Sequence, residues 1–270
     1  MELVTYLFEW NRFAFYGLAF LGIILARYFV IAGGLHLFFY SAGGNFLAHR
    51  VVGLAPPSGT SIRRDIHLSM CSAVIFALSA AAIVSSYDLG LVRLYADIHA
   101  YGLWYLAVSY GLVLLLQDTY FYFIHRLFHH PRLFRWFHQG HHQSDQPTPW
   151  TSFAFDPPEA AIQSLFLMAI VFILPLHFIT VIAVLITMTV WAVVNHLGLD
   201  LFPPAFPHHW LGRWFIGPAH HSIHHHQYRR HYGLYFTFWD KLLGTNDPSY
   251  ERDFAIADDL PSSVPNDEGD

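Results

Sequence analysis

The stretch YGLWYLAVSYGLVLLLQDTYFYFIHRLFHH, residues 101–130, is an apolar segment that ends in a run of histidines. Residues 101–124 are long enough to cross the hydrocarbon of a bilayer, which takes about 20 mostly apolar residues. Burial in lipid gives no reason for the three imidazoles of HRLFHH at 125–130. Two further clusters, HQGHH at 138–142 and HHSIHHH at 220–226, show that these imidazoles are part of a larger pattern.

The composition of the whole chain is that of an integral membrane protein. It has 270 residues, 54% of them hydrophobic and only 12% charged, about half the charged fraction of a soluble domain. Further long apolar segments lie at 13–40, 66–84, 160–174 and 176–197, the last two separated by Pro175. We predict an all-α helical bundle of about four to five transmembrane or re-entrant helices with a cytosolic, histidine-rich helical cap.

The net charge of −5 comes largely from the C-terminal end of the chain. Residues 258–270, DDLPSSVPNDEGD, have few apolar side chains and two prolines, and we expect them to form a disordered acidic tail. Residues 1–257 are expected to form a single membrane-embedded domain. They are close to neutral and carry no basic patch of the kind that binds nucleic acid.

The distribution of arginines predicts the orientation, because cytoplasmic loops of membrane proteins carry an excess of basic residues. The connection between the second and third apolar segments has only Arg93, against Asp88 and Asp97. The other three connections are basic, with Arg50, Arg63, Arg64, Arg126, Arg132, Arg135, Arg213, Arg229, Arg230 and Lys241. We therefore expect every histidine cluster on the cytosolic face of a bacterial inner membrane or an endoplasmic reticulum.

The spacing of the histidines indicates metal ligands. On a helix, residues i, i+3 and i+4 share one face. His125 and His129 are four residues apart, and the sets 138, 141, 142 and 221, 224, 225 each have the i, i+3, i+4 pattern. Each triplet can aim its imidazoles at one point, or bridge two ions. Imidazole suits zinc, copper, iron and nickel, and so many ligands favour two ions.

The three clusters, with NHLG at 195–198 between the second and third, resemble those of the fatty acid hydroxylase/sterol desaturase superfamily. The flanking words PTPWTSFAFDPPEA and YGLYFTFWDKLLGT strengthen the resemblance, which covers about residues 118–245. It implies a membrane-embedded di-iron monooxygenase that uses O2 and two electrons to hydroxylate or desaturate a C–H bond of a membrane lipid such as a fatty acyl chain or sterol. The metal ligands that it implies are His125, His129, His138, His141, His142, His196, His221, His224 and His225.

The resemblance also implies a separate electron-donor protein, of the cytochrome b5 or ferredoxin type, because the chain has no redox module of its own. Arg126, Arg132 and Arg135 could dock this donor, or they could serve only to fix the topology and to meet anionic headgroups. The resident ions are expected to be two irons, which zinc can replace in preparations.

Three residues outside the clusters are candidates for holding the ligands in position: Asp118, Asn195 and Asp240, with Glu159 considered beside them. Asp118 precedes His125 by seven residues on the same helix face, and could bind a ligand imidazole or simply pack against a neighbouring helix. The sequence departs from many relatives at two positions, with His231 in place of asparagine and Asp156 in place of histidine. No specific role follows for His208, His209, His220, His226 or His231.

Other functions remain open at this stage. On the same scaffold they are a carotenoid-type hydroxylase and an ether-lipid monooxygenase. From a different class, a metal-binding membrane transporter would have ionisable residues near the middle of several apolar segments, where only Arg27 clearly lies.

Overall fold

The computed structural model describes residues 2–42, 57–144, 146–203, 206 and 209–247. Its long helices are α1 (Glu2–Tyr28), α3 (Gly59–Asp88), α4 (Leu103–Phe128), α7 (Pro157–Ile173) and α8 (Phe178–Asn195). The short helices are η1 (Phe29–Gly33), α2 (Gly34–His36), η2 (Leu37–Ala42), α5 (Phe134–Phe137), α6 (Gln139–His142), η4 (Pro149–Phe153), η5 (Gly212–Trp214), α9 (Pro218–Gln227) and α10 (Phe238–Leu242). Two-residue strands, β1 (Leu94–Tyr95) and β2 (Leu176–His177), complete the fold.

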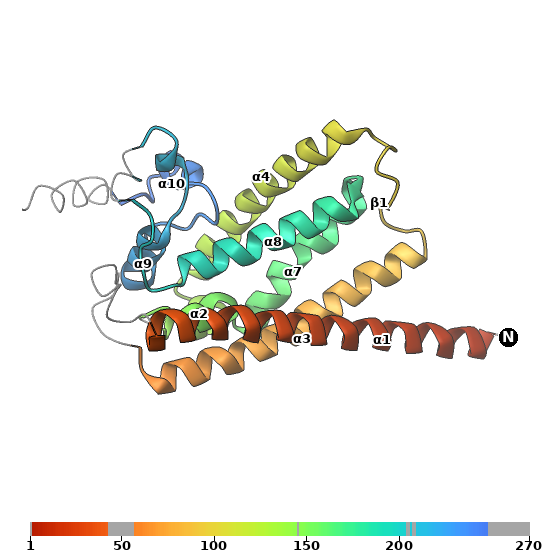
Figure 1. Cartoon of the computed structure of the whole chain (residues 1–270), viewed down its shortest axis with the longest axis horizontal. Helices are drawn as coiled ribbons and strands as arrows, with labels where there is room; N and C mark the ends of the chain where they lie inside the picture. Colours follow the sequence, from red (N-terminus) through yellow and green to blue (C-terminus); the bar gives the residue numbers. More distant parts are fainter. Residues whose placement is uncertain (1, 43–56, 145, 204–205, 207–208, 248–270) are drawn as a thin grey trace, which may run out of the picture.

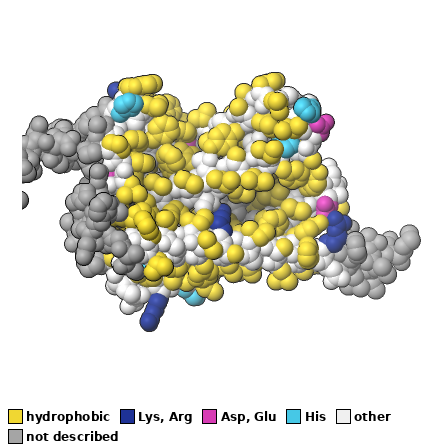
Figure 2. Space-filling model, in the orientation of Figure 1, with side chains coloured by type: hydrophobic (Ala, Val, Ile, Leu, Met, Phe, Trp, Pro, Cys, Tyr) yellow, Lys and Arg dark blue, Asp and Glu magenta, His cyan; other side chains and the backbone are white. Residues whose placement is uncertain are grey.

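The predicted helical membrane bundle is confirmed. Four helical stretches in the described part of the chain are long and apolar enough to cross a membrane: Trp10–Tyr40, Gly59–Asp88, Leu103–Phe128 and Phe178–Asn195. The fifth apolar helix, Pro157–Ile173, is shorter. Large apolar side chains stand exposed along these helices, and the yellow surface in Figure 2 shows how much of the visible face is hydrophobic. Such a surface is suited to lipid.

The helices pack in pairs around an apolar core. α1 lies along α3, α3 contacts α7, and α4 contacts both α7 and α8 (Figure 1). Val113, Ile170, Val171 and Val184 are buried where the last three of these helices meet. The small helices α9 and α10 lie at the end of the bundle opposite the N-terminus. This end carries the histidine clusters, so the bundle has one apolar body and one polar, histidine-rich cap.

The helix boundaries follow from local chemistry. The Ser58 side chain accepts a hydrogen bond from the Ser61 N–H and begins α3, seven residues earlier than the apolar run at 66–84 suggests. Pro157 occupies the first turn of α7, where its missing N–H costs nothing. Between α7 and α8, β2 pairs in parallel with β1, a contact that an all-α prediction does not contain. Two-residue strands are too short to leave a sequence pattern.

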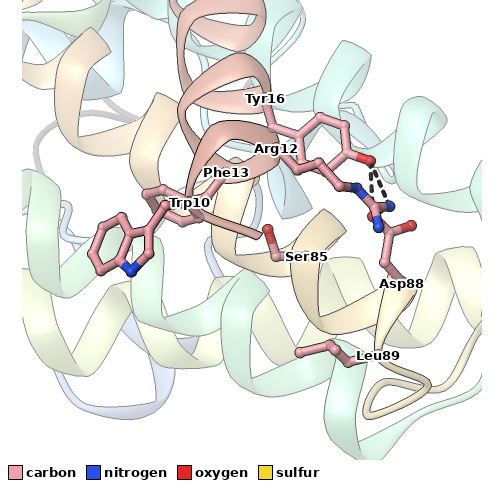
Figure 3. A pocket seen from close by; sticks show the side chains of 7 residues that line it. All are labelled: Trp10, Arg12, Phe13, Tyr16, Ser85, Asp88 and Leu89. Carbon is pink, nitrogen blue, oxygen red and sulfur yellow. Dashed lines mark hydrogen bonds and ion pairs between the residues drawn. The ribbon is translucent and has the colours of Figure 1, made fainter. Parts of the chain in front are cut away.

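A polar contact joins α1 to α3 at the end of the bundle far from the cap. Figure 3 shows Arg12 and Tyr16 of α1 reaching Asp88 at the end of α3, and the Tyr16 hydroxyl donates to Asp88 Oδ2 at 2.7 Å. These residues line a cavity of about 300 Å³. The contact joins α1 and α3 at the end of the bundle that lies far from the histidine-rich cap. The predicted tail at 258–270 lies outside the described residues, and the single domain over residues 1–257 stays a prediction.

Candidate metal centre

The first group of histidines forms around the end of α4. His125 lies in the last turn of α4, and His129 is its C-cap residue, one turn further on. His138 and His142 come from the N-cap and the end of α6, and His224 comes from α9. One nitrogen from each of these five side chains lies within 4.8 Å of those of the others. Three separate segments of chain therefore meet at a single point.

The second group forms around the end of α8. His196 is the C-cap residue of α8, His141 comes from α6, and His221 and His225 lie one turn apart on α9. Their nitrogens also lie within 4.8 Å of one another. All nine expected ligands therefore belong to one of the two groups. The rings of His142 and His225, one from each group, are 4.7 Å apart between centroids, so the groups are neighbours.

The two i, i+3, i+4 triplets do not each aim at one point. His138 and His142 belong to the first group, whereas His141 belongs to the second. In each triplet the i and i+4 histidines share a group, and the i+3 histidine belongs to the other, because neighbouring residues on a helix point about 100° apart. The α9 helix, which is regular, likewise divides its ligands, because His224 faces the first group. From the sequence, each triplet could aim its imidazoles at one point or bridge two ions. The geometry fits the second alternative.

The second ring nitrogen of many of these histidines is hydrogen-bonded. The Nδ1 atoms of His125, His141, His196 and His224 lie 2.7–3.2 Å from backbone carbonyl oxygens. A carbonyl oxygen can only accept, so Nδ1 carries the proton and donates it. In a neutral imidazole the other nitrogen, Nε2, is then left with a lone pair. Such contacts fix the tautomer and the orientation of metal-binding histidines.

The Nε2 atoms point at one another with no proton between them. His141 and His196 both donate through Nδ1 to carbonyl groups, yet their Nε2 atoms are 3.3 Å apart. Two lone pairs at this distance repel unless a cation lies beside them. A proton is a poor candidate, because burial lowers the pKa of His141 to about 3 and the pKa of His196 to about 4.

The donor set fits metal ions. Within the two groups, neighbouring Nε2 atoms are 2.9–3.3 Å apart. Two imidazoles bound to one ion at about 2.1 Å and at right angles would hold their nitrogens about 3 Å apart. Burial also lowers the pKa values of His221, His224 and His225 well below that of a free imidazole, so their nitrogens are available to a metal at neutral pH.

Among the described residues, Glu159 is the carboxylate that is hydrogen-bonded to an imidazole ring of the two groups. Its Oε2 lies 2.8 Å from His138 Nδ1, and both side chains are almost completely buried. The proline-rich start of α7 places Glu159 in the first helical turn, facing the cap. The sequence offered Glu159 only as an additional candidate, because its partner is 21 residues away on another element.

Asp118 does not make the imidazole contact considered from the sequence. Its Oδ1 accepts backbone N–H groups from Leu234, Tyr235 and Phe236 at 3.2, 2.7 and 3.1 Å. The side chain therefore packs α4 against the segment that follows the third cluster. Of the two roles considered from the sequence, Asp118 therefore has the packing role, but its partner is a loop and not a neighbouring helix.

Asp240 acts on the ligands through one intermediate. Its Oδ1 accepts the Tyr232 N–H at 2.8 Å, and the carbonyl oxygen of Tyr232 accepts from His125 Nδ1. Asn195 is buried beside His196, and its Oδ1 has no hydrogen-bond partner in the described part of the chain. Asp240 thus positions the His125 imidazole indirectly, and Asn195 stays a candidate.

The two departures from the family pattern both lie against the cap. Asp156 Oδ2 accepts the Gly140 N–H at 2.7 Å, at the start of α6. A Cβ on Gly140 would lie 2.3 Å from Asp156 Oδ1, so a larger residue does not fit there. His231 has a φ of +56°, and its Nε2 accepts the Asp247 N–H at 3.3 Å. Asp156 therefore holds the start of α6, which carries His141 and His142, whereas His231 holds the chain at Asp247, beyond α10.

The remaining histidines of the cap hold backbone groups. His220 Nδ1 accepts the Gly217 N–H at the start of α9, and His226 Nδ1 donates to the Ser222 carbonyl at its end. His209 Nδ1 accepts the Leu211 and Gly212 N–H groups. His208 lies outside the described residues.

A helical membrane bundle capped by two adjoining groups of buried histidines defines a class of membrane metalloprotein. Residues 110–245, about half of the chain, match the model of a family described as fatty acid hydroxylase. The chain therefore belongs to the fatty acid hydroxylase family, as the resemblance in its sequence implied. All nine histidines lie within the matched segment.

Characterised relatives are sterol-modifying oxidoreductases by name. A Delta(7)-sterol 5(6)-desaturase of Gibberella zeae is 35% identical over 162 residues, which cover 58% of this chain and 49% of that protein. Human lathosterol oxidase is 32% identical over 194 residues, 70% of this chain and 63% of the relative. A second Delta(7)-sterol 5(6)-desaturase, from Aspergillus fumigatus, is 29% identical over 236 residues, 80% and 72% of the two chains. No solved structure matches the chain significantly.

Proposed function

We propose that this protein is an O2-dependent di-iron oxidoreductase that hydroxylates or desaturates a C–H bond of a membrane lipid. The observation that carries the proposal is the convergence of Nε2 lone pairs in two adjoining groups, which calls for two cations side by side. The names of the relatives favour a sterol as the lipid and desaturation as the reaction.

The proposed ligands of one iron are His125, His129, His138, His142 and His224, and those of the other are His141, His196, His221 and His225. When bound, the two irons would supply the activation of O2 that attack on an unreactive C–H bond requires. The polypeptide holds the imidazoles in their neutral form, and it fixes five of the nine rings through four carbonyl oxygens and Glu159.

The position of the two groups suits a lipid substrate. They form at the ends of α4 and α8, both long enough to cross a membrane, so the site lies close to the end of the apolar body. Eight of the nine ligands are buried, and the ninth, His129, is partly buried. Such a site keeps water away from the reacting carbon while the rest of the lipid stays among the spans.

The two electrons would come from a separate donor of the cytochrome b5 or ferredoxin type. Arg126 in the first cluster, and Arg132 and Arg135 on the segment that follows it, are exposed and offer positive charge to an acidic partner. The distribution of basic residues along the chain supports the cytosolic face of a bacterial inner membrane or an endoplasmic reticulum for this docking.

Metal analysis and lipid analysis together test the proposal. Protein purified under reducing, metal-controlled conditions is expected to bind about two irons, and a His67→Ala control on the exposed part of α3 is expected to bind the same number. Membranes supplied with lathosterol or palmitate, O2 and reductant are expected to yield an oxidised lipid, and His141→Ala membranes to yield none. Iron-loaded protein that leaves every lipid unchanged with reductant and donor present would refute the proposal.

A further inference from the structure

One arginine, Arg27, lies well inside a candidate membrane span and pairs with no carboxylate that the structure describes. Arg27 is in α1, within the apolar stretch Trp10–Tyr40. A charged side chain at such a depth is costly, and it usually has an ion-pair partner or faces a cavity. Among the described residues no carboxylate pairs with Arg27, whereas Arg12 of the same helix is paired with Asp88. Arg27 therefore needs a different explanation from Arg12.

The contacts of Arg27 satisfy only part of its hydrogen-bonding capacity. Its Nη1 donates to Thr189 Oγ1 of α8 at 2.8 Å, and its guanidinium carbon lies 5.0 Å from the centre of the Phe153 ring. Its Nε is buried and has no hydrogen-bond partner. A guanidinium has five N–H donors and no acceptor, so its remaining N–H groups require further acceptor atoms such as oxygens. Thr189 already donates to the Leu185 carbonyl and can only accept from Arg27.

A hollow lies between α1 and α8, the two helices that the hydrogen bond from Arg27 to Thr189 joins. α1 packs along α3 and α8 packs along α4, so the two helices that Arg27 and Thr189 join belong to different packed pairs. Figure 2 shows a hollow between them, with a basic side chain at its edge and hydrophobic side chains around it. One turn from Arg27 and Thr189, away from the cap, Ile23 and Leu185 are exposed.

On the side towards the cap the same gap is filled. Ile31, one turn after Arg27, packs against the buried cluster of Val193, Leu197 and Leu199, which begins one turn after Thr189. Thr189 precedes His196 by seven residues, which places it about 10 Å along the helix axis from the metal centre. Phe153, which the guanidinium covers, is followed by Ala154, whose carbonyl oxygen accepts from His141 Nδ1. The hollow is thus separate from the histidine groups but shares a segment with them.

We propose that this hollow is a lipid-binding site in which Arg27 binds an acceptor oxygen at the polar end of a membrane lipid. The hollow lies within the spans and has apolar walls, so its ligand is a lipid and not a water-soluble anion. A carboxylate would also neutralise the guanidinium, and a sterol hydroxyl would accept from it without doing so. Phosphate headgroups are excluded by the depth, because they stay at the membrane surface.

Binding measurements on the whole protein in phosphatidylcholine nanodiscs test this, with radiolabelled palmitate and lathosterol as the two probes. Arg27→Met is expected to weaken binding of at least one probe about tenfold, which corresponds to about 1.4 kcal/mol. The probe that is lost identifies the ligand as a carboxylate or a hydroxyl. Arg12→Met makes the same change on the same helix at a paired arginine, and is expected to leave both affinities unchanged.

The alternative is that Arg27 only pins α1 to α8. Thr189→Val removes that hydrogen bond but keeps the charge, so it should retain more affinity than Arg27→Met does. Equal binding of both probes by wild type and Arg27→Met would overturn the proposal. Should Arg27→Met fail to fold, photoreactive palmitate and sterol probes on the wild type decide: labels are expected near residues 23–27 and 185–189, and labels spread evenly over all spans would overturn it. These tests measure binding alone, so they stand apart from the proposed oxidation.

Discussion

Removal of the Glu159 carboxylate should weaken one metal site and spare the other. Glu159 accepts from His138 Nδ1 at 2.8 Å, and both side chains are almost completely buried. In Glu159→Ala the ring N–H would lose its acceptor, which costs about 1–3 kcal/mol in a buried place. The ring would also lose its fixed orientation. Loss of such a partner typically reduces metal affinity about 10–100-fold, or about 1.4–2.8 kcal/mol.

The two histidine groups provide an internal control for this experiment. His138 belongs to the first group, whereas His141, His196, His221 and His225 form the second. Competition with a chelator of known affinity should therefore release one ion early from Glu159→Ala and the other at the wild-type concentration. Glu159→Gln keeps an acceptor oxygen and should lose much less affinity. Unchanged release of both ions from Glu159→Ala, or equal weakening of both, would show that the carboxylate does not support this site.

Three further predictions follow from the same geometry. His225→Ala should remove the second ion and leave the first bound, as measured by metal content; loss of neither ion would contradict the assignment. Asp118→Ala leaves three N–H groups of residues 234–236 without their acceptor and should lower the unfolding free energy by about 1–3 kcal/mol in thermal melts, more than Asp118→Asn does. In metal-free protein, burial lowers the pKa values of His141 and His196 below the value of about 6.5 in the unfolded chain, so the unfolded state takes up protons first as the pH falls. Stability should then decrease from about pH 6.5 towards pH 4 by up to about 1.4 kcal/mol per pH unit for each such histidine, and denaturant titrations that give the same stability at pH 7.5 and pH 5 would contradict this.

Much of the fold could be predicted from the sequence because lipid imposes a simple rule. Apolar runs of sufficient length become spans, and the structure has helices at each of the five predicted positions. The ends of the helices were less predictable. α4 continues to Phe128, past the last apolar residue of its run, because His125 is buried inside the protein rather than exposed to water. A hydropathy pattern ends where polar residues begin, even when the helix does not.

The site was predictable in its members and less so in its arrangement. The histidine spacing indicated eight of the nine residues and the family resemblance added His196, but neither could show that His138 and His141 belong to different groups. That division depends on how α6 and α9 are oriented toward the ends of α4 and α8, which the local spacing does not specify. The partners of the ligands were harder still, because four of them are backbone carbonyls, which every residue has. Asp118 and Asp240 were both candidates because they are acidic residues near the clusters. Only the structure shows that Asp118 binds the N–H groups of residues 234–236, whereas Asp240 binds those of Tyr232 and Gly233.

The long reach of Asp118 affects how the protein is made. During translation α4 enters the bilayer before residues 234–236 exist, since Asp118 precedes Tyr235 by 117 positions. An aspartate near the middle of an inserting helix costs about 3 kcal/mol, and each leucine there returns about half a kcal/mol. Four leucines lie between residues 112 and 116, and only Gln117 separates them from Asp118. The apolar side chains of this helix thus offset much of the cost of inserting an unpaired carboxylate. Asp118 gains its hydrogen-bond donors only after residues 234–236 have been made.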